Sequence, residues 1–339
     1  MSNSKVLVND VLINITGGSI GRCYYVSDEF SDANVNQHVC IIRPNEKILT
    51  IYLYNLLRSD IGQEQVDICQ TGGNREALNF EQLKKFVIPL PDLKEQAAIA
   101  NYLDKKTTEL DTLIAKKENL IALLKEERTA IINQAVTKGL DPDVEMKDSG
   151  VDGSDRRWLG EIPAHWEGKK LKYITNLKSG ENITSDLIIA DGEFPVYGGN
   201  GLRGNYCKYT NEGNYVLIGR QGALCGNINY ASDKFGASEH AILCHFFNGH
   251  NWLWLGMLLE TMNHNPYSQS AAQPGLAVEK IKNLSIPVPS FTEQNEIVSF
   301  VESNNIRIDL LMNKTNQEIT LLKEYKTALI SEVVTGKVV

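Results

Sequence analysis

Three features of the sequence could support covalent, cofactor or metal chemistry. "GNGLRG" at 199–204 matches the glycine pattern of dinucleotide sites, and "NPY" at 265–267 partly matches the Asn-Pro-Pro-aromatic motif of amino-methyltransferases. The glycine pattern requires a helix directly after it, whereas "NYCKYTNEGN" predicts a loop. "NPY" lacks the second proline and no glycine-rich site for a methyl donor accompanies it, and the six cysteines are widely spaced without a CxxC pair. We therefore predict no catalytic residue, no bound cofactor and no metal site in this chain.

Polar side chains suited to reading nucleic-acid bases occur in the glycine-rich turns instead. Arg and Lys pair with guanine, and Asn and Gln pair with adenine. Arg220 and Gln221 follow an apolar stretch in "YVLIGRQGA", and they are the leading candidates for such contacts if the chain binds DNA. Further candidates, each of which could instead be an ordinary loop residue, are Lys178, Ser179, Asn200, Arg203 and Gln273. In the stretch "QTGGNREA" at 70–77 the candidates are Gln70, Thr71, Asn74 and Arg75.

These residues belong to a chain that repeats itself. "KKFVIPLPDLKEQAAI" at 84–99 and "KNLSIPVPSFTEQNEI" at 282–297 align at a constant offset, which holds without a gap to Thr137 and Thr335. Each Pro-x-Pro ends a strand and excludes a helix just upstream. Asp92 and Ser290 then precede a Glu by three positions, the spacing of a helix capping box. The repeated boundary therefore predicts a strand end joined to a helix start.

Each boundary is followed by a long amphipathic stretch without Gly or Pro. We predict two helices of roughly 40 residues, or about 60 Å each, whose apolar stripes pack on each other as a coiled coil. Two independent helices, each packed on its own domain, are the alternative. The predicted seam residues are Leu103, Leu110, Leu113, Leu120, Leu124, Ile131, Val301, Ile308, Leu311, Ile319, Leu322 and Leu329.

The globular parts upstream of the helices are also related. "DVLINITGGSIG" at 10–21 aligns with "YVLIGRQGALCG" at 215–226, and "NQHVCII" aligns with "SEHAILC". We interpret the paired His38 and His240 as structural residues rather than ligands. The second part has a long stretch before this shared core, from Trp158 to Tyr215, whereas the first part has only the few residues before Val11. We therefore expect a first domain that is truncated at its N-terminal side.

The chain should form an α+β fold in which two mixed domains are joined by the two helices. The predicted boundaries are a first domain at 1–91, a first helix at 92–138, a polar linker at 139–157, a second domain at 158–289 and a second helix at 290–339.

Composition limits the partners that the chain can bind. Its 339 residues carry a net charge of −8, which excludes coating of nucleic acid by bulk electrostatics, so any DNA contact must be local. No basic signal region or membrane-length apolar run is present, and a cytoplasmic location is the default expectation.

Taken together, the repeat, the Pro-x-Pro-x-x-x-Glu-Gln boundary, the long helices and "WLGEIPAHWEGKKLKYI" resemble the specificity subunits of type I restriction-modification systems. The resemblance implies two target-recognition domains that each read half of a split DNA sequence, and an antiparallel coiled coil that separates them and docks two modification subunits. S-adenosylmethionine, ATP and Mg would then be used by the modification and restriction subunits, not by this chain. The alternative is a truncated interaction subunit that reads one half-site as a homodimer or with another fragment.

Overall fold

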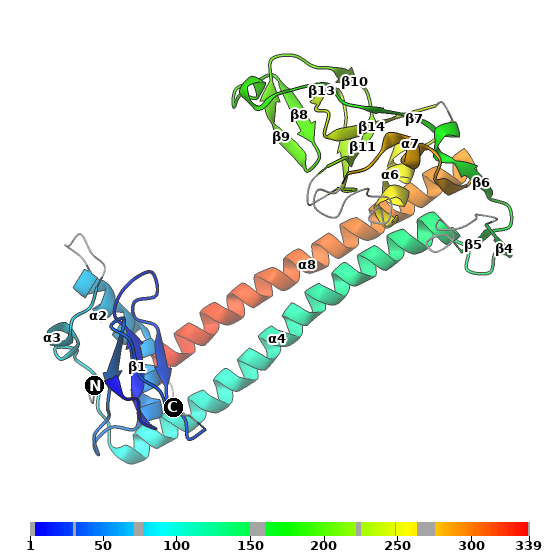
Figure 1. Cartoon of the computed structure of the whole chain (residues 1–339). Helices are drawn as coiled ribbons and strands as arrows, with labels where there is room; N and C mark the ends of the chain where they lie inside the picture. The colour runs from blue at the N-terminus through cyan, green and yellow to red at the C-terminus, as the bar shows by residue number, and fades with distance from the viewer. Residues whose placement is uncertain are drawn as a thin grey trace. The chain divides into compact units, whose positions relative to one another are not determined.

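The computed structural model describes residues 4–29, 32–70, 77–149, 160–221, 225–247, 249–262 and 275–337, and every structural statement below refers to these residues. The chain divides into two compact units, residues 1–122 with 311–339 and residues 123–310. Both long helices therefore contribute one part to each unit. Figure 1 shows the chain, with labels on those elements for which there is room.

The first unit contains a small antiparallel sheet with the strand order β2-β1-β3. Its strands are β1 (Val11–Asn14), β2 (Cys23–Tyr25) and β3 (Val39–Ile42). Residues of β1 alternate between buried and half-buried, as expected for a strand with one face on a core. Three helices follow: α1 (Thr50–Arg58), α2 (Asp60–Gln70) and α3 (Phe80–Leu83). Leu53 and Leu57 of α1 pack against Val11 of β1.

The second unit contains two four-stranded sheets. The first has the order β12-β11-β14-β7 and consists of β7 (Thr175–Ser179), β11 (Tyr215–Gly219), β12 (Ile228–Ala231) and β14 (Ala241–Phe246). The second has the order β10-β13-β8-β9 and consists of β8 (Phe194–Gly198), β9 (Gly201–Tyr206), β10 (Asn211–Glu212) and β13 (Lys234–Ala237). Because β13 and β8 are parallel while the other pairs are antiparallel, the domain is mixed, and the α+β prediction is confirmed.

Shorter elements complete the second unit. Two two-stranded pairs join β4 (Met146–Asp148) to β5 (Glu161–Pro163) and β6 (Glu167–Lys170) to β15 (Ser285–Val288). The helices are η3 (Leu171–Tyr173), η4 (Ser185–Leu187), α6 (Trp252–Thr261) and α7 (Val278–Lys282).

The sheets of the two units share one topology. In the first unit β1 pairs antiparallel with β2 and β3, and in the second unit β11 pairs antiparallel with β12 and β14. A helix then follows the third strand in both cases, α1 in one and α6 in the other. The second unit adds β7 along the outer edge of β14. Among the described residues of the first unit, β3 has no such neighbour.

The long helices are α4 (Leu93–Lys138) and α8 (Phe291–Val334), with 46 and 44 residues. At 1.5 Å per residue they are about 69 and 66 Å long. Each begins two positions after its Pro-x-Pro, as predicted. The Asp92 carboxylate accepts from the Glu95 amide at 2.8 Å, and the Ser290 hydroxyl accepts from the Glu293 amide at 3.2 Å. No described helix is long and apolar enough to cross a membrane.

A buried glutamine fixes each helix start to its own domain. Gln96 and Gln294 have no exposed surface. The Gln96 side chain accepts from the amide of Leu49 at 2.8 Å and donates to the carbonyls of Pro91 and Lys47, both at 2.9 Å. Gln294 repeats the arrangement, because it accepts from the amide of Asn251 at 2.8 Å and donates to the carbonyl of Pro289 at 3.0 Å.

Leu49 and Asn251 are the N-cap residues of α1 and α6. One amide side chain therefore joins the second proline of Pro-x-Pro, the start of the long helix and the start of the domain helix. In the second unit this proline directly follows β15, as predicted, but residues 84–91 of the first unit form no strand, so the predicted strand end occurs at only one of the two boundaries. The same three-way junction is built in both units.

Ion pairs between α4 and α8 show that the helices run antiparallel. In the first unit Asp111 pairs with Lys326 at 2.6 Å and Lys117 with Glu318 at 2.5 Å. In the second unit Glu127 pairs with Arg307 at 2.7 Å, and Arg128 pairs with Asp309. Exposed pairs of this kind contribute at most about 1 kcal/mol each, whereas burying one large apolar side chain contributes about 1.5–3 kcal/mol. The apolar seam is therefore the main source of the association.

The buried seam differs from the predicted one at three positions. Leu113, Leu120 and Leu311 are 41%, 44% and 41% exposed, so their assignment to the seam was wrong. The predicted residues Leu103, Leu124, Val301, Ile308, Ile319 and Leu329 are buried, and Leu110, Ile131 and Leu322 are half-buried.

The helical period explains this difference. The prediction used spacings of three, four and seven, and a seven-residue step drifts about 20° around a straight helix. In α8 the buried isoleucines instead recur about every three helical turns, at Ile297, Ile308, Ile319 and Ile330. In α4 the buried residue beside Leu113 is Ile114.

Replacing either junction glutamine should destabilise its own unit. Gln96→Ala or Gln294→Ala leaves a buried helix N-cap amide and a buried carbonyl without partners, and we expect the free energy of unfolding to fall by about 2–3 kcal/mol. Urea unfolding followed by circular dichroism measures the change. Gln317→Ala, an exposed glutamine in α8, is the matched control. Equal stability of the three variants would contradict a structural role for the junction.

Candidate nucleic-acid interface

In the second unit, turns from both sheets meet beside the end of β7. A Cβ atom on Gly199, in the turn between β8 and β9, would lie 2.9 Å from the carbonyl oxygen of Gln221 and 3.1 Å from that of His240. The amide of Ser238 donates to the carbonyl of Tyr197 at 2.8 Å. The close approach of three backbones therefore requires glycine at 199 and gathers the loops into one surface.

The predicted leading contacts lie on this surface. Arg220 directly follows β11 and is half-buried, and its Nη1 donates to the Ser179 hydroxyl at 3.1 Å. Gln221 is exposed beside it, as are Lys178 on β7 and Asn200 in the β8–β9 turn. The Arg220–Ser179 contact joins the loop after β11 to the end of β7, and the close approach of Gly199 to Gln221 adds the turn that contains Asn200.

Arg203 is also exposed, but its guanidinium is already engaged. It lies on β9, where Nη2 donates to the Ser185 hydroxyl at 3.1 Å and Nη1 to the Ile183 carbonyl at 3.5 Å. The glycine pattern "GNGLRG" therefore forms a hairpin turn leading into a strand, and this geometry excludes the dinucleotide site that the pattern resembles.

The remaining predicted contacts are not placed on this surface. Gln70 is the half-buried last residue of α2 in the first unit. Thr71, Asn74, Arg75 and Gln273 lie outside the described residues.

Three polar residues that border the same turns of the second unit were not predicted from the sequence. Asn229 Nδ2, Ser238 Oγ and Glu239 Oε2 are buried atoms without a hydrogen-bond partner among the described residues. They border the β8–β9 turn, since Cβ atoms on Gly201 and Gly198 would lie 2.8 Å from Asn229 Oδ1 and 3.4 Å from Ser238 Oγ. Buried polar atoms are nearly always hydrogen-bonded. These three atoms can therefore form further hydrogen bonds with water or a ligand.

The first unit contains an equivalent loop after β1. The amide of Ile15 donates to the carbonyl of His38 at 2.9 Å, as the amide of Arg220 does to the carbonyl of His240 at 2.7 Å. Thr16 and Gln221 occupy the next position in each loop and form isolated bridges with Ala77 and Gly275 respectively. The two loops therefore have the same backbone connections, although only the second was predicted to contact DNA at this position.

The side chains differ between the equivalent loops. Ile15 is 8% exposed and packs in the apolar core with Ile13 and Leu78, whereas the equivalent Arg220 reaches the hydroxyl of Ser179 at the end of β7. The first unit has neither the arginine at this place nor, among its described residues, a strand that corresponds to β7. Among the described residues, an arginine at this position of the loop is therefore present in the second unit alone.

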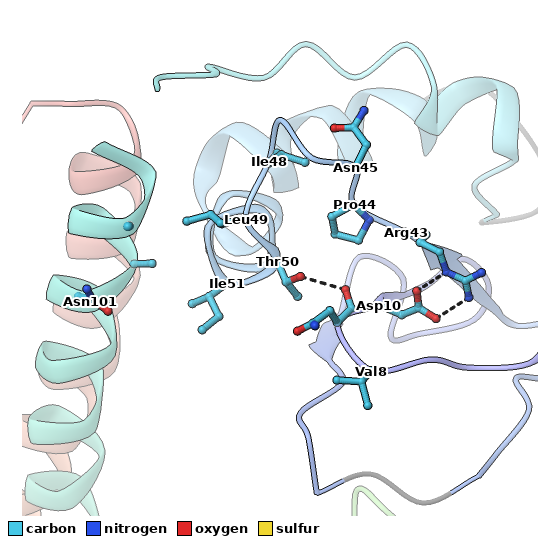
Figure 2. Close-up of a pocket in the computed structure, with 13 residues that line it drawn as sticks. Val8, Asp10, Arg43, Pro44, Asn45, Ile48, Leu49, Thr50, Ile51 and Asn101 are labelled. Atoms are coloured by element: carbon cyan, nitrogen blue, oxygen red, sulfur yellow. Dashed lines mark hydrogen bonds and ion pairs between the residues drawn. The ribbon is translucent and has the colours of Figure 1, made fainter. Parts of the chain in front are cut away.

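A pocket in the first unit was not predicted. It has a volume of about 460 Å³ and lies between the loops around Asp10 and Arg43 and the first turns of α4. Figure 2 shows Arg43 facing Asp10 through two dashed bonds, and these are 2.7 and 2.8 Å long.

The ion pair in this pocket is already satisfied. Burial acts to raise the pKa of Asp10, but the hydrogen bonds from Arg43 and from the Leu7 amide outweigh it and hold that pKa below its usual value. The remaining lining is largely apolar, and among the described residues no group of His, Cys, Asp and Glu is arranged to hold a metal. We assign no chemistry to this pocket.

Comparison with known proteins defines the class. The family described as "Type I restriction modification DNA specificity domain" matches residues 2–123 and 163–321. Because this match covers well over half of the chain, the chain belongs to that family.

Individual relatives agree with this assignment. The type I restriction enzyme EcoprrI specificity subunit of Escherichia coli is 31% identical over 252 residues, which are 71% of this chain and 57% of that protein. The chain thus spans less than two thirds of that relative.

Two solved structures share the fold. A chain from a study of complex assembly and conformational transition of the type I R-M system aligns with a TM-score of 0.78 and 16% identity, over 98% of this chain and 84% of that one. The HsdS subunit from Thermoanaerobacter tengcongensis aligns with a TM-score of 0.62 and 17% identity, over 100% and 84% of the two chains.

Exchanging the residues at the equivalent positions 15 and 220 should change the free energy of unfolding much more at position 15 than at position 220. Ile15→Arg places a charge in an apolar core, and we expect the free energy of unfolding to fall by about 3 kcal/mol. Arg220→Ile should change it by less than about 1 kcal/mol, because Arg220 is half-buried at the surface. Urea unfolding of the two variants provides the comparison. Similar losses in both would show that the two loops are packed in the same way.

Proposed function

We propose that the chain is the DNA-recognition and scaffold subunit of a type I restriction-modification complex and directs methylation and cleavage by partner subunits. The main support for this proposal is that both units contain the same arrangement. Each unit has a loop with polar side chains after its central strand, and each is joined to the paired long helices through the same glutamine junction. Such a frame suits the reading of two half-sites by one protein.

The polar side chains predicted as base contacts in the second unit have the chemistry that DNA recognition requires. Lys178 and Arg220 can bind phosphates or guanine, and Asn200 and Gln221 can bind adenine. Because the whole chain is acidic, these few side chains would carry the local attraction for double-stranded DNA.

The helices support docking of two copies of one partner. Tyr102 and Phe300, which align with each other in the repeat, are 42% and 44% exposed, and the aligned Leu113 and Leu311 are each 41% exposed. Large apolar side chains that stay exposed at equivalent places in both repeats are typical of a binding surface used twice. The partners would be two modification subunits, which use S-adenosylmethionine, and through them restriction subunits that use ATP and Mg.

A second candidate function is an interaction subunit that reads DNA with its second domain alone. The difference at positions 15 and 220, and the extra strands of the second unit, favour this alternative. Such a subunit would bind modification subunits through its helices. It would complete its target by self-association or together with another fragment.

Deletion of the gene should remove a methylation pattern. We expect cells that carry the intact operon to methylate adenine within one bipartite DNA motif, and we expect this methylation to disappear on deletion and to return on complementation. Genome-wide methylation sequencing measures it. An unchanged methylome after deletion would contradict the proposed function.

The symmetry of the motif distinguishes the two candidates. An asymmetric bipartite motif is expected if both units of one chain read DNA, because Arg220 and Gln221 are replaced by Ile15 and Thr16 in the first unit. A palindromic motif is expected if two copies each contribute the second domain. Light scattering on the purified chain then tests whether it self-associates.

A further inference from the structure

Each unit holds a histidine in the same turn, directly before the third strand of the shared sheet. The amide of Val39 donates to the carbonyl of Asn36 at 3.2 Å, and the amide of Ala241 donates to the carbonyl of Ser238 at 2.9 Å. His38 and His240 are the residues before Val39 and Ala241. Both turns therefore hold the histidine backbone in equivalent places.

Each histidine contacts the side chain of the loop residue that follows the central strand. In the second unit, His240 Nδ1 lies 2.9 Å from Gln221 Oε1. In the first unit, His38 Nδ1 lies 2.5 Å from Thr16 Oγ1. The histidine is thus the same in both units, while its partner is Gln in one and Thr in the other.

These side chains are accessible rather than part of a core. The His240 side chain is 43% exposed, and Gln221 and His38 lie at the surface. An exposed hydrogen bond between side chains contributes little to stability, since water competes for both groups. Its presence at the same place in both units therefore needs a reason other than stability.

The contact with His240 holds the Gln221 side chain in place. His240 Nδ1 lies beside Gln221 Oε1 and His240 Nε2 faces Glu239 Oε1 at 3.3 Å; because both oxygens can only accept, a ring that carries a proton on each nitrogen donates to both. Gln221 Nε2 has no partner among the described residues, and Oε1 keeps a second lone pair. The Gln221 amide then presents a donor, Nε2, and an acceptor, Oε1, side by side, which is the pattern that pairs with N7 and N6 of adenine.

The geometry points to His38 and His240 as positioning residues for Thr16 and Gln221, which read one base in each half of a split DNA target. Gln221 would read an adenine, and Thr16 would contact a base in the other half. The inference rests on the proposed function and adds to it the residues that set specificity. The repeated histidine supplies a constant support, and the residue that it holds supplies the difference between half-sites.

The test maps the methylated motif of cells whose operon carries Gln221→Ala, His240→Ala or His240→Asn. We expect the first two variants to lose the requirement for adenine at one and the same position of one half-site. His240→Asn keeps a donor close to the place of Nδ1 and should restore that requirement. Thr16→Ala and His38→Ala should change one position of the other half-site only.

Binding of purified complex to duplexes with single base-pair changes in the wild-type motif provides a second measurement. It also scores variants that methylate too little for mapping. Gln221→Ala and His240→Ala should bind the unchanged duplex about tenfold or more weakly and no longer distinguish the altered base pair. His245→Ala, an exposed histidine farther along β14, is the matched control and should keep the wild-type preference.

Three results would overturn the inference. They are a motif unchanged in Gln221→Ala, a loss of preference in His240→Ala at a different position, or a failure of His240→Asn to restore what His240→Ala loses. Absence of any motif in the wild type would instead contradict the proposed function itself. Melting temperatures close to the wild type exclude simple unfolding as the cause.

Discussion

A buried glutamine amide at the start of each long helix is the interaction on which the rest of the structure depends. Gln96 and Gln294 each join the second proline of a Pro-x-Pro, a long helix and the N-cap of a domain helix. Since a helix start leaves its first amides without partners, one side chain that satisfies such a group also fixes the position of the helix that contains it. Each globular part is thereby oriented by its own long helix.

The long helices add a second constraint, which is the repeat length of their buried face. Because an α-helix has about 3.6 residues per turn, side chains that recur every three turns stay on nearly one face, and α8 follows this repeat from Ile297 to Ile330. Leu113 and Leu311 then lie beside the seam and remain exposed in both repeats. The same period thus explains both which residues hold the helices together and which apolar residues are left for partners.

Much of the fold follows from patterns along the sequence, and the site follows only in part. Pro-x-Pro with a capping residue predicts where α4 and α8 begin, and apolar runs between glycines predict β11 and β14. The pairing of Thr16 with His38 could not be predicted, because it joins two side chains whose contact depends on the geometry of two separate turns. Likewise, Ile15 and Arg220 align in sequence, but only burial in the core shows that the first unit uses that position for packing.

The repeated junction has a consequence for how such chains can change over evolutionary time. Most of its polar contacts are made by the glutamine, the proline carbonyl and the backbone at the start of one domain helix, and Gln294 Nε2 also lies 3.2 Å from His250 Nδ1. A recombination event that exchanges everything between two such junctions would therefore retain the hydrogen bonds to these backbone groups, whatever the incoming loops contain. New binding preferences could arise in a single genetic step without a loss of stability that later mutations would have to repair.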